Sequence, residues 1–129
     1  GVLGVGWLAD ALAGLPPRGQ HSGARVLEAG TFEVALTLAP AAPVAGNQTS
    51  ITIAVRDLAG QRVAPTRFHG ALSMPAKGMN PFEPAWEALA PGLYRAVTAF
   101  PIAGAWSLAV SLSDASGRTA TAQFAILVR

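Results

Sequence analysis

Cysteine is absent from the 129-residue sequence, which excludes disulfide bonds, thiolate metal sites and a cysteine nucleophile. Charged residues are also scarce: they make up 12% of the chain, about half of the usual share. Nine Lys and Arg stand against seven Asp and Glu, scattered singly, so the sequence has no basic stripe and predicts no nucleic-acid partner. Hydrophobic residues make up 51%, which is enough for one domain with a sizeable core.

No apolar run reaches the length of about 20 residues that a membrane-spanning helix needs. The longest run is residues 1–15, which Asp10 interrupts and Pro16 closes. Two interpretations stay open: this run is the end of a signal or membrane anchor, or it is a short amphipathic helix that packs on the domain. Its glycines favour the first, because glycine is poor in a water-exposed helix. We predict that residues 1–30 form an apolar segment and tether outside the core, followed by a β-sandwich domain at residues 31–129.

From residue 31 onward, apolar and polar residues alternate with the period of two that is typical of half-buried strands. Glycine, proline, asparagine and aspartate occupy the breaks between these runs, as turns require. The pattern predicts an all-β fold, an immunoglobulin-like antiparallel β-sandwich of seven or eight strands. The predicted strands are residues 31–38, 51–55, 62–64, 66–73, 85–89, 93–100, 105–113 and 119–128. The predicted core consists of Phe32, Val34, Leu36, Ile51, Ile53, Val55, Trp106, Leu108, Val110, Phe124 and Ile126.

Residues 74–84 interrupt the alternation with three prolines and a glycine, and form the longest irregular segment of the predicted domain. Both methionines of the chain, Met74 and Met79, lie in this loop, and His69 precedes the first by five positions. Thioethers and imidazole together suit a soft ion such as Cu(I), so these three residues are the candidate metal ligands. The alternative is that the two methionines only plug the open end of the sandwich.

The sequence predicts no catalytic residues, and we expect the protein not to be an enzyme. No Gly-x-Ser-x-Gly element is present, and no carboxylate is placed in the sequence to orient His69. No glycine-rich phosphate loop precedes a helix, so nucleotide binding has no support either.

A series of short motifs gives the sequence a family resemblance. The series comprises the strands at residues 32–38 and 51–55, the turn at 57–60, Met74-Pro75 with Gly78-Met79, Pro91-Gly92-Leu93-Tyr94, and Gly104-Ala105-Trp106. In this order the motifs resemble the YtkA-like and FixH-like family of small extracytoplasmic immunoglobulin-like domains. Members of that family accompany copper handling, heavy-metal efflux or cytochrome oxidase maturation, and their Met-Pro loop often continues with His or further Met. Here Lys77 stands at such a position, where a protonated amine would repel a cation.

Two functions from different classes are therefore expected. One is a periplasmic or extracellular domain, either secreted or tethered to the membrane through its N-terminus, that binds or relays Cu(I). Met74 and Met79 are its expected thioether ligands, and His69 is the candidate for a third. The other is a non-catalytic immunoglobulin-like interaction module without a metal site. In either case the resemblance implies a partner protein in metal handling or respiratory assembly.

Overall fold

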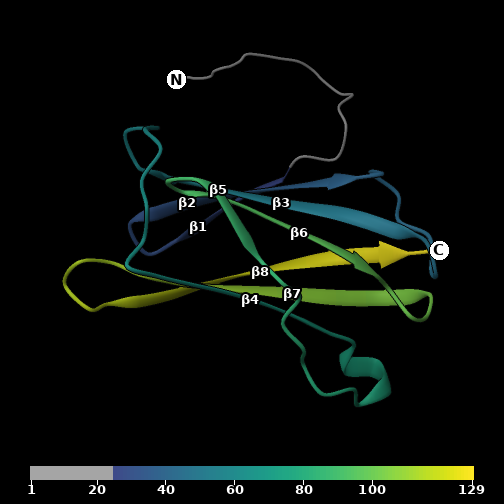
Figure 1. Ribbon diagram of the computed structural model, residues 1–129. Helices are drawn as coiled ribbons and strands as arrows, with labels where there is room; N and C mark the ends of the chain where they lie inside the picture. The colour runs from purple at the N-terminus through teal and green to yellow at the C-terminus, as the bar shows by residue number, and fades with distance from the viewer. Residues whose placement is uncertain (1–24) are drawn as a thin grey trace.

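Two antiparallel sheets pack face to face in the computed structural model, which describes residues 25–129 (Figure 1). A single 3-10 turn, η1, interrupts the succession of strands in this part of the chain. The strands are β1 (Arg25–Ala29), β2 (Phe32–Ala39), β3 (Gln48–Asp57), β4 (Arg67–Ser73), β5 (Glu87–Ala90), β6 (Leu93–Ala99), β7 (Gly104–Ser113) and β8 (Thr119–Val128), with η1 (Pro75–Lys77) between β4 and β5.

The first sheet has the strand order β1-β2-β3-β6-β5 and the second the order β4-β7-β8. Without β1, this is the four-plus-three arrangement of a constant-type immunoglobulin sandwich. The predicted fold class is therefore confirmed. Within residues 25–129, no helix has the length and apolar content that crossing a bilayer requires.

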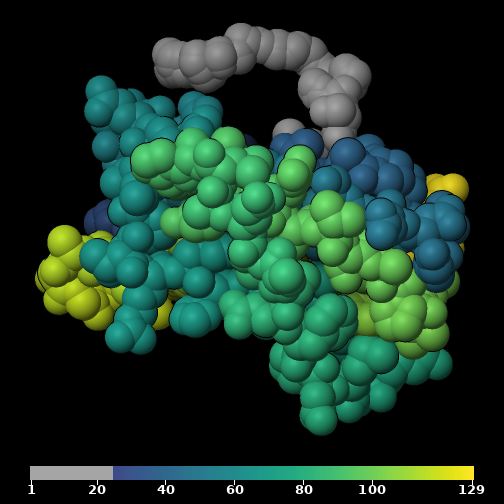
Figure 2. Space-filling view, in the orientation of Figure 1, coloured from purple at the N-terminus to yellow at the C-terminus, as the bar shows by residue number. Residues whose placement is uncertain are grey.

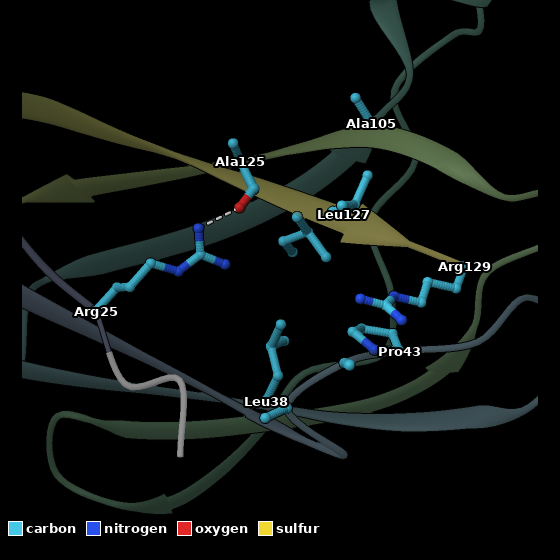
Figure 3. Close-up of a pocket in the computed structure, with 10 residues that line it drawn as sticks. Arg25, Leu38, Pro43, Ala105, Ala125, Leu127 and Arg129 are labelled. Atoms are coloured by element: carbon cyan, nitrogen blue, oxygen red, sulfur yellow. Dashed lines mark hydrogen bonds between the residues drawn. The ribbon is translucent and has the colours of Figure 1, made fainter. Parts of the chain in front are cut away.

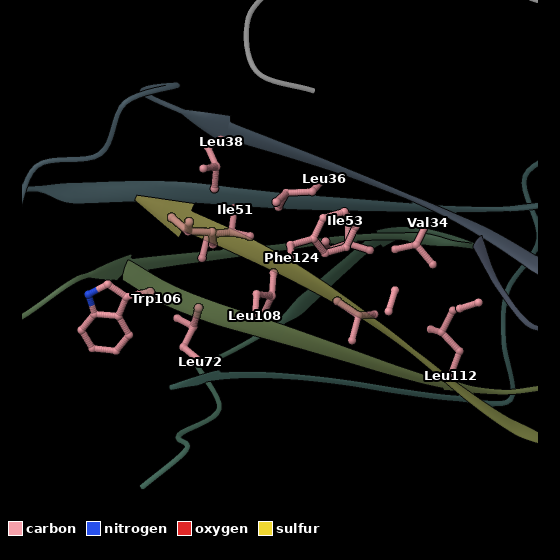
Figure 4. Packing of buried hydrophobic residues seen from close by; sticks show 14 of the residues in the cluster. Val34, Leu36, Leu38, Ile51, Ile53, Leu72, Trp106, Leu108, Leu112 and Phe124 are labelled. Carbon is pink, nitrogen blue, oxygen red and sulfur yellow. The ribbon is translucent and has the colours of Figure 1, made fainter. Parts of the chain in front are cut away.

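The core lies between the two sheets and is built from the inward faces of β2, β3, β7 and β8 (Figure 4). All eleven residues predicted for it are buried, and the most exposed of them, Phe32, has only 6% of its surface accessible. Trp106 is 1% exposed, and its indole N–H donates to the carbonyl of Ile102 at 3.0 Å. Because a one-residue slip would turn the buried set of a strand to solvent, the alternation predicts which face of each strand is inward.

The structure corrects the predicted boundary between tether and domain. Residues 25–29 form β1, which pairs antiparallel with β2, so the sandwich begins at Arg25 rather than at residue 31. The strand escaped prediction because it is an edge strand, with four of its five residues exposed and no alternation of apolar and polar positions. The apolar segment at residues 1–15 lies outside the described residues.

Of the other predicted strands, one is absent, one is shifted, and several differ only at their ends. Residues 62–64 form no strand, and only Arg62 makes an isolated bridge, to Arg56. The strand predicted at residues 85–89 is observed as β5, Glu87–Ala90. It begins later because Trp86 is used for contacts with β4 across the open side of the sandwich.

Candidate functional site

The segment from Met74 to Trp86 connects β4 of one sheet to β5 of the other. It contains η1 and projects beyond the sandwich, at the lower right of Figures 1 and 2. The exposed residues of this segment are Pro75, Ala76, Lys77, Gly78, Asn80, Pro81, Phe82, Glu83 and Ala85. Loops held by a rigid sandwich often carry function, so this projecting loop, residues 74–86, is the candidate site.

A tight turn forms the tip of the loop. Pro75 begins η1, where its missing N–H costs no hydrogen bond, and the backbone N–H of Lys77 donates to the carbonyl of Met74 at 3.1 Å. Gly78 ends the turn in the left-handed region with φ of 63°, a conformation that favours glycine. The chain then returns, and the N–H of Met79 also donates to the carbonyl of Met74, at 3.4 Å.

Met74 is a core residue. Only 2% of it is exposed, and it belongs to the buried cluster between the sheets. Its side chain lies against the backbone of β7, since a Cβ added at Gly104 would lie 3.0 Å from its Cε and 3.8 Å from its Sδ. Met74 therefore fills the end of the core beneath the loop.

Met79 is half-buried and packs against the same cluster. The backbone bond to Met74 joins the two positions, and both side chains pack against the core cluster at this end of the sandwich. Lys77, in contrast, is exposed at the tip of the turn.

His69 lies apart from the two methionines. On β4 it alternates with Phe68, Gly70 and Leu72, so its imidazole lies on the outer face of the three-stranded sheet. Its side chain is 62% exposed, and Nδ1 lies 3.2 Å from Oε2 of Glu83. Five residues of extended chain also separate its Cα from that of Met74 by roughly 16 Å. The structure therefore does not bring the three predicted ligands together. In residues 25–129, no group of three or more His, Asp or Glu side chains is placed to hold a metal ion either.

Glu83 and Trp86 fasten the returning part of the loop to β4. Oε2 of Glu83 accepts the backbone N–H of Gly70 at 3.1 Å, in addition to its contact with His69. The Trp86 indole N–H donates to the carbonyl of Gly70 at 2.9 Å. The two side chains thus form hydrogen bonds with the N–H and the carbonyl of Gly70. No local sequence pattern predicts this role for Glu83 or Trp86.

Aromatic rings extend this attachment into the space between the sheets. The ring of Phe68 meets Trp86 edge-on, with centroids 5.1 Å apart, and stacks on Tyr94 of β6 at 3.9 Å. Burial in this stack raises the pKa of Tyr94. Trp86 therefore contacts its neighbours in the sheets through an aromatic cluster.

The middle of the loop is held as well. Leu72 and Phe82 exchange two backbone hydrogen bonds, of 2.8 and 2.9 Å, so residue 82 extends the sheet by one bridge along the outer edge of β4. Phe82 also meets Trp106 edge-on, with centroids 6.2 Å apart. The loop is consequently attached at its start, its middle and its end.

Taken together, these features define an immunoglobulin-like β-sandwich domain with one projecting, well-attached loop. The chain belongs to the YtkA-like family, whose model matches residues 27–111, more than half of the sequence. No curated protein matches the sequence.

Solved structures of low sequence identity share the fold. A DUF4426 family protein from Pseudomonas aeruginosa PAO1 is 13% identical to this chain, with a TM-score of 0.59. The superposition covers 81% of this chain and 94% of that protein. A DUF4785 family protein from Legionella pneumophila is 9% identical with a TM-score of 0.60 over 76% of this chain. This chain spans only 28% of the length of that protein. The filamin domain of Lin-41 is 17% identical to this chain, with a TM-score of 0.52. The superposition covers 67% of this chain and 81% of that domain.

Proposed function

We propose that this chain is a non-catalytic, extracytoplasmic interaction module that docks on a partner protein through the loop at residues 74–86. One observation carries the proposal: the loop is attached to the sandwich at three points, while its tip projects into solvent. A surface that is already ordered before binding loses little conformational entropy when a partner docks. This is the property expected of a recognition element.

The chemistry of the tip suits a protein surface. Pro75, Ala76 and Pro81 are exposed and offer small apolar contacts, and Phe82 is 37% exposed beside them. Lys77 adds one positive charge at the end of the turn. Such a mixture of apolar contacts with one charge is what the interface of a transient complex contains.

The location and the kind of partner rest on the family resemblance. Extracytoplasmic domains of this type accompany metal handling and respiratory assembly, and the apolar run at residues 1–15 is of the kind that signals and membrane anchors carry. The proposed partner is therefore a protein of one of those two systems. A non-catalytic role is supported by the immunoglobulin-like sandwich, which presents loops on a rigid scaffold.

Site-specific photocross-linking in the source cells tests the docking role. A photoreactive residue at Ala76, at the tip of the loop, is compared with one at Ala115, an exposed alanine in the turn between β7 and β8. We expect a discrete adduct with one protein species from position 76 and none from position 115. No adduct from position 76, or the same adducts from both positions, would overturn the proposal.

Cu(I) binding is the second candidate function, and the hydrogen bond from Met79 N–H to the Met74 carbonyl favours it. Two thioethers at one end of the sandwich are donors that a soft ion prefers. His69 is left out of this set because it lies on the other face of β4.

Titration of the purified domain with Cu(I) against a competing chelator separates the two functions. A copper site predicts sub-micromolar binding that is abolished by Met79→Ala and by Met74→Leu, a change that removes the sulfur while keeping the core filled. Replacing Lys77 with His would strengthen such binding. The docking function predicts no Cu(I) binding by any of these proteins.

A further inference from the structure

A hollow of about 400 Å³ lies beside β8, far along the chain from the loop just described (Figure 3). Because β8 ends its sheet, the hollow opens between this edge, the start of β1 and residues 41–43. Its wall is mostly apolar, with Leu38, Pro43, Ile126 and Leu127 among its members, and Arg25 and Arg129 lie at its two ends. A volume of this size with an apolar wall and a few polar groups is typical of small-molecule sites.

The charged side chains of the hollow are all positive. Two of the ten described residues that line it are arginines, and none is acidic. A guanidinium of Arg25 donates to the carbonyl of Ala125, which directs this side chain across the edge of β8 (Figure 3). Since a guanidinium carries five N–H donors, one such bond leaves others for an anion.

The backbone of β8 adds a third polar element. Peptide groups of alternate residues in a strand face the same edge. Ala125 accepts from Arg25 there. The N–H of Arg129 donates to the carbonyl of Pro43 at 2.9 Å, and the carbonyl of Arg129 accepts from the N–H of Ala45 at 2.7 Å. Leu127 lies between Ala125 and Arg129, so its N–H faces this edge as well, flanked by the two arginines.

Leu127 adds exposed apolar surface to the hollow, because 65% of this residue is accessible. Its side chain lies in the wall of the hollow, between the cationic ends. An apolar surface of this kind next to two guanidinium groups complements a molecule that is apolar along one part and anionic at one end.

We propose that this hollow binds a small anionic amphiphile, a carboxylate carried on an unbranched apolar tail. Arg25 or Arg129 pairs with the carboxylate, and the Leu127 N–H donates to it. The tail covers the exposed apolar residues of the hollow, Ala41, Ala42 and Leu127. The site is independent of the loop at residues 74–86.

Octanoate is the probe for this site, and binding is followed by backbone NMR of the full chain. We expect shift changes confined to residues 25, 38, 41–43, 105 and 125–129, which line the hollow. The affinity should be about tenfold higher than for acetate, which lacks the tail, or octanol, which lacks the charge. Raising the salt concentration should weaken the binding of octanoate and leave that of octanol unchanged. Equal binding of octanol and octanoate would overturn the proposal, as would shift changes elsewhere in the chain.

Matched variants assign the site. Leu127→Glu places a carboxylate in the hollow and should abolish octanoate binding. Leu58→Glu is the control, because Leu58 is 64% exposed and lies in a distant turn. This change should leave octanoate binding intact. Arg25→Gln and Arg129→Gln should each weaken binding about fivefold or more. Unchanged affinity in both arginine variants would contradict the assignment. If a short peptide with a free C-terminus binds more tightly than octanoate at the same residues, the proposed small-molecule ligand is wrong.

Discussion

Gly70 and Trp86 are fitted to each other. A Cβ added at Gly70 would lie 2.5 Å from Cζ2 of Trp86, closer than real Cβ contacts allow, and the indole N–H donates to the Gly70 carbonyl at 2.9 Å. Gly70 has no positive φ, so the position needs glycine for space and not for backbone conformation. The absence of one side chain on β4 is thus what allows the loop to close on the sandwich.

Gly70→Ala should therefore destabilise the domain by roughly 1–3 kcal/mol, because the added methyl group must displace a packed indole. Urea unfolding measures the loss. The double variant Gly70→Ala, Trp86→Ala provides the control. Once the indole is gone, the added methyl group should no longer lower the free energy of unfolding much. The double-mutant cycle should therefore give a clear interaction energy between the two positions. Simple additivity of the two changes would show that the contact does not matter.

Met74→Ala should cost about 2–5 kcal/mol, the range measured for large-to-small changes at fully buried sites. Met79→Ala, at a half-buried position, should cost about 1 kcal/mol or less. The comparison of unfolding free energies checks the assignment of Met74 to the core. A loss at Met74 as small as the loss at Met79 would contradict the assignment of Met74 to the core.

Glu83→Ala removes the acceptor of the buried Gly70 N–H and should cost about 1–2 kcal/mol. Glu87→Ala is the matched control, because Glu87 is exposed and makes only an ion pair with Arg95 at 3.5 Å. Such pairs contribute little, so this change should cost less than about 0.5 kcal/mol. The prediction fails if the control is as destabilising as Glu83→Ala.

Asp114 should give the domain part of its sensitivity to acid. A hydrogen bond from the Ser116 hydroxyl, followed by backbone bonds from Arg118 and Ser116, holds the pKa of this exposed carboxyl below its usual value. The folded state then binds the proton less readily than the unfolded state, so the stabilisation is present above about pH 4 and is lost as the pH falls through the lowered pKa. Asp114→Asn should flatten the stability profile below about pH 4. An unchanged profile would show that the turn does not contribute.

The core was predictable from the sequence because it depends on local periodicity. Phe32, Ile53 and Trp106 each sit in a run whose alternation assigns one face to the interior, and all three are buried. The two sheets follow from that pattern and from the turns between runs. The edge strand β1 was missed because its side chains are mostly exposed and show no such alternation.

The geometry around the loop was less predictable because it depends on contacts between residues distant in sequence. Met74 and Met79 lie on either side of the turn at Gly78, and a backbone hydrogen bond joins them. The placement of His69 with Glu83, and of Trp86 over Gly70, follows from how the returning chain crosses β4. No pattern of one strand contains that information.

NMR relaxation across residues 74–86 tests most directly whether the loop is ordered before any partner binds. With Met74 in the core, Leu72 bonded to Phe82 and Trp86 bonded to Gly70, the account predicts backbone order parameters near 0.85, as in the strands. Values below about 0.6 at the tip, from Pro75 to Met79, would contradict it, because a loop that moves freely is not a preformed docking surface.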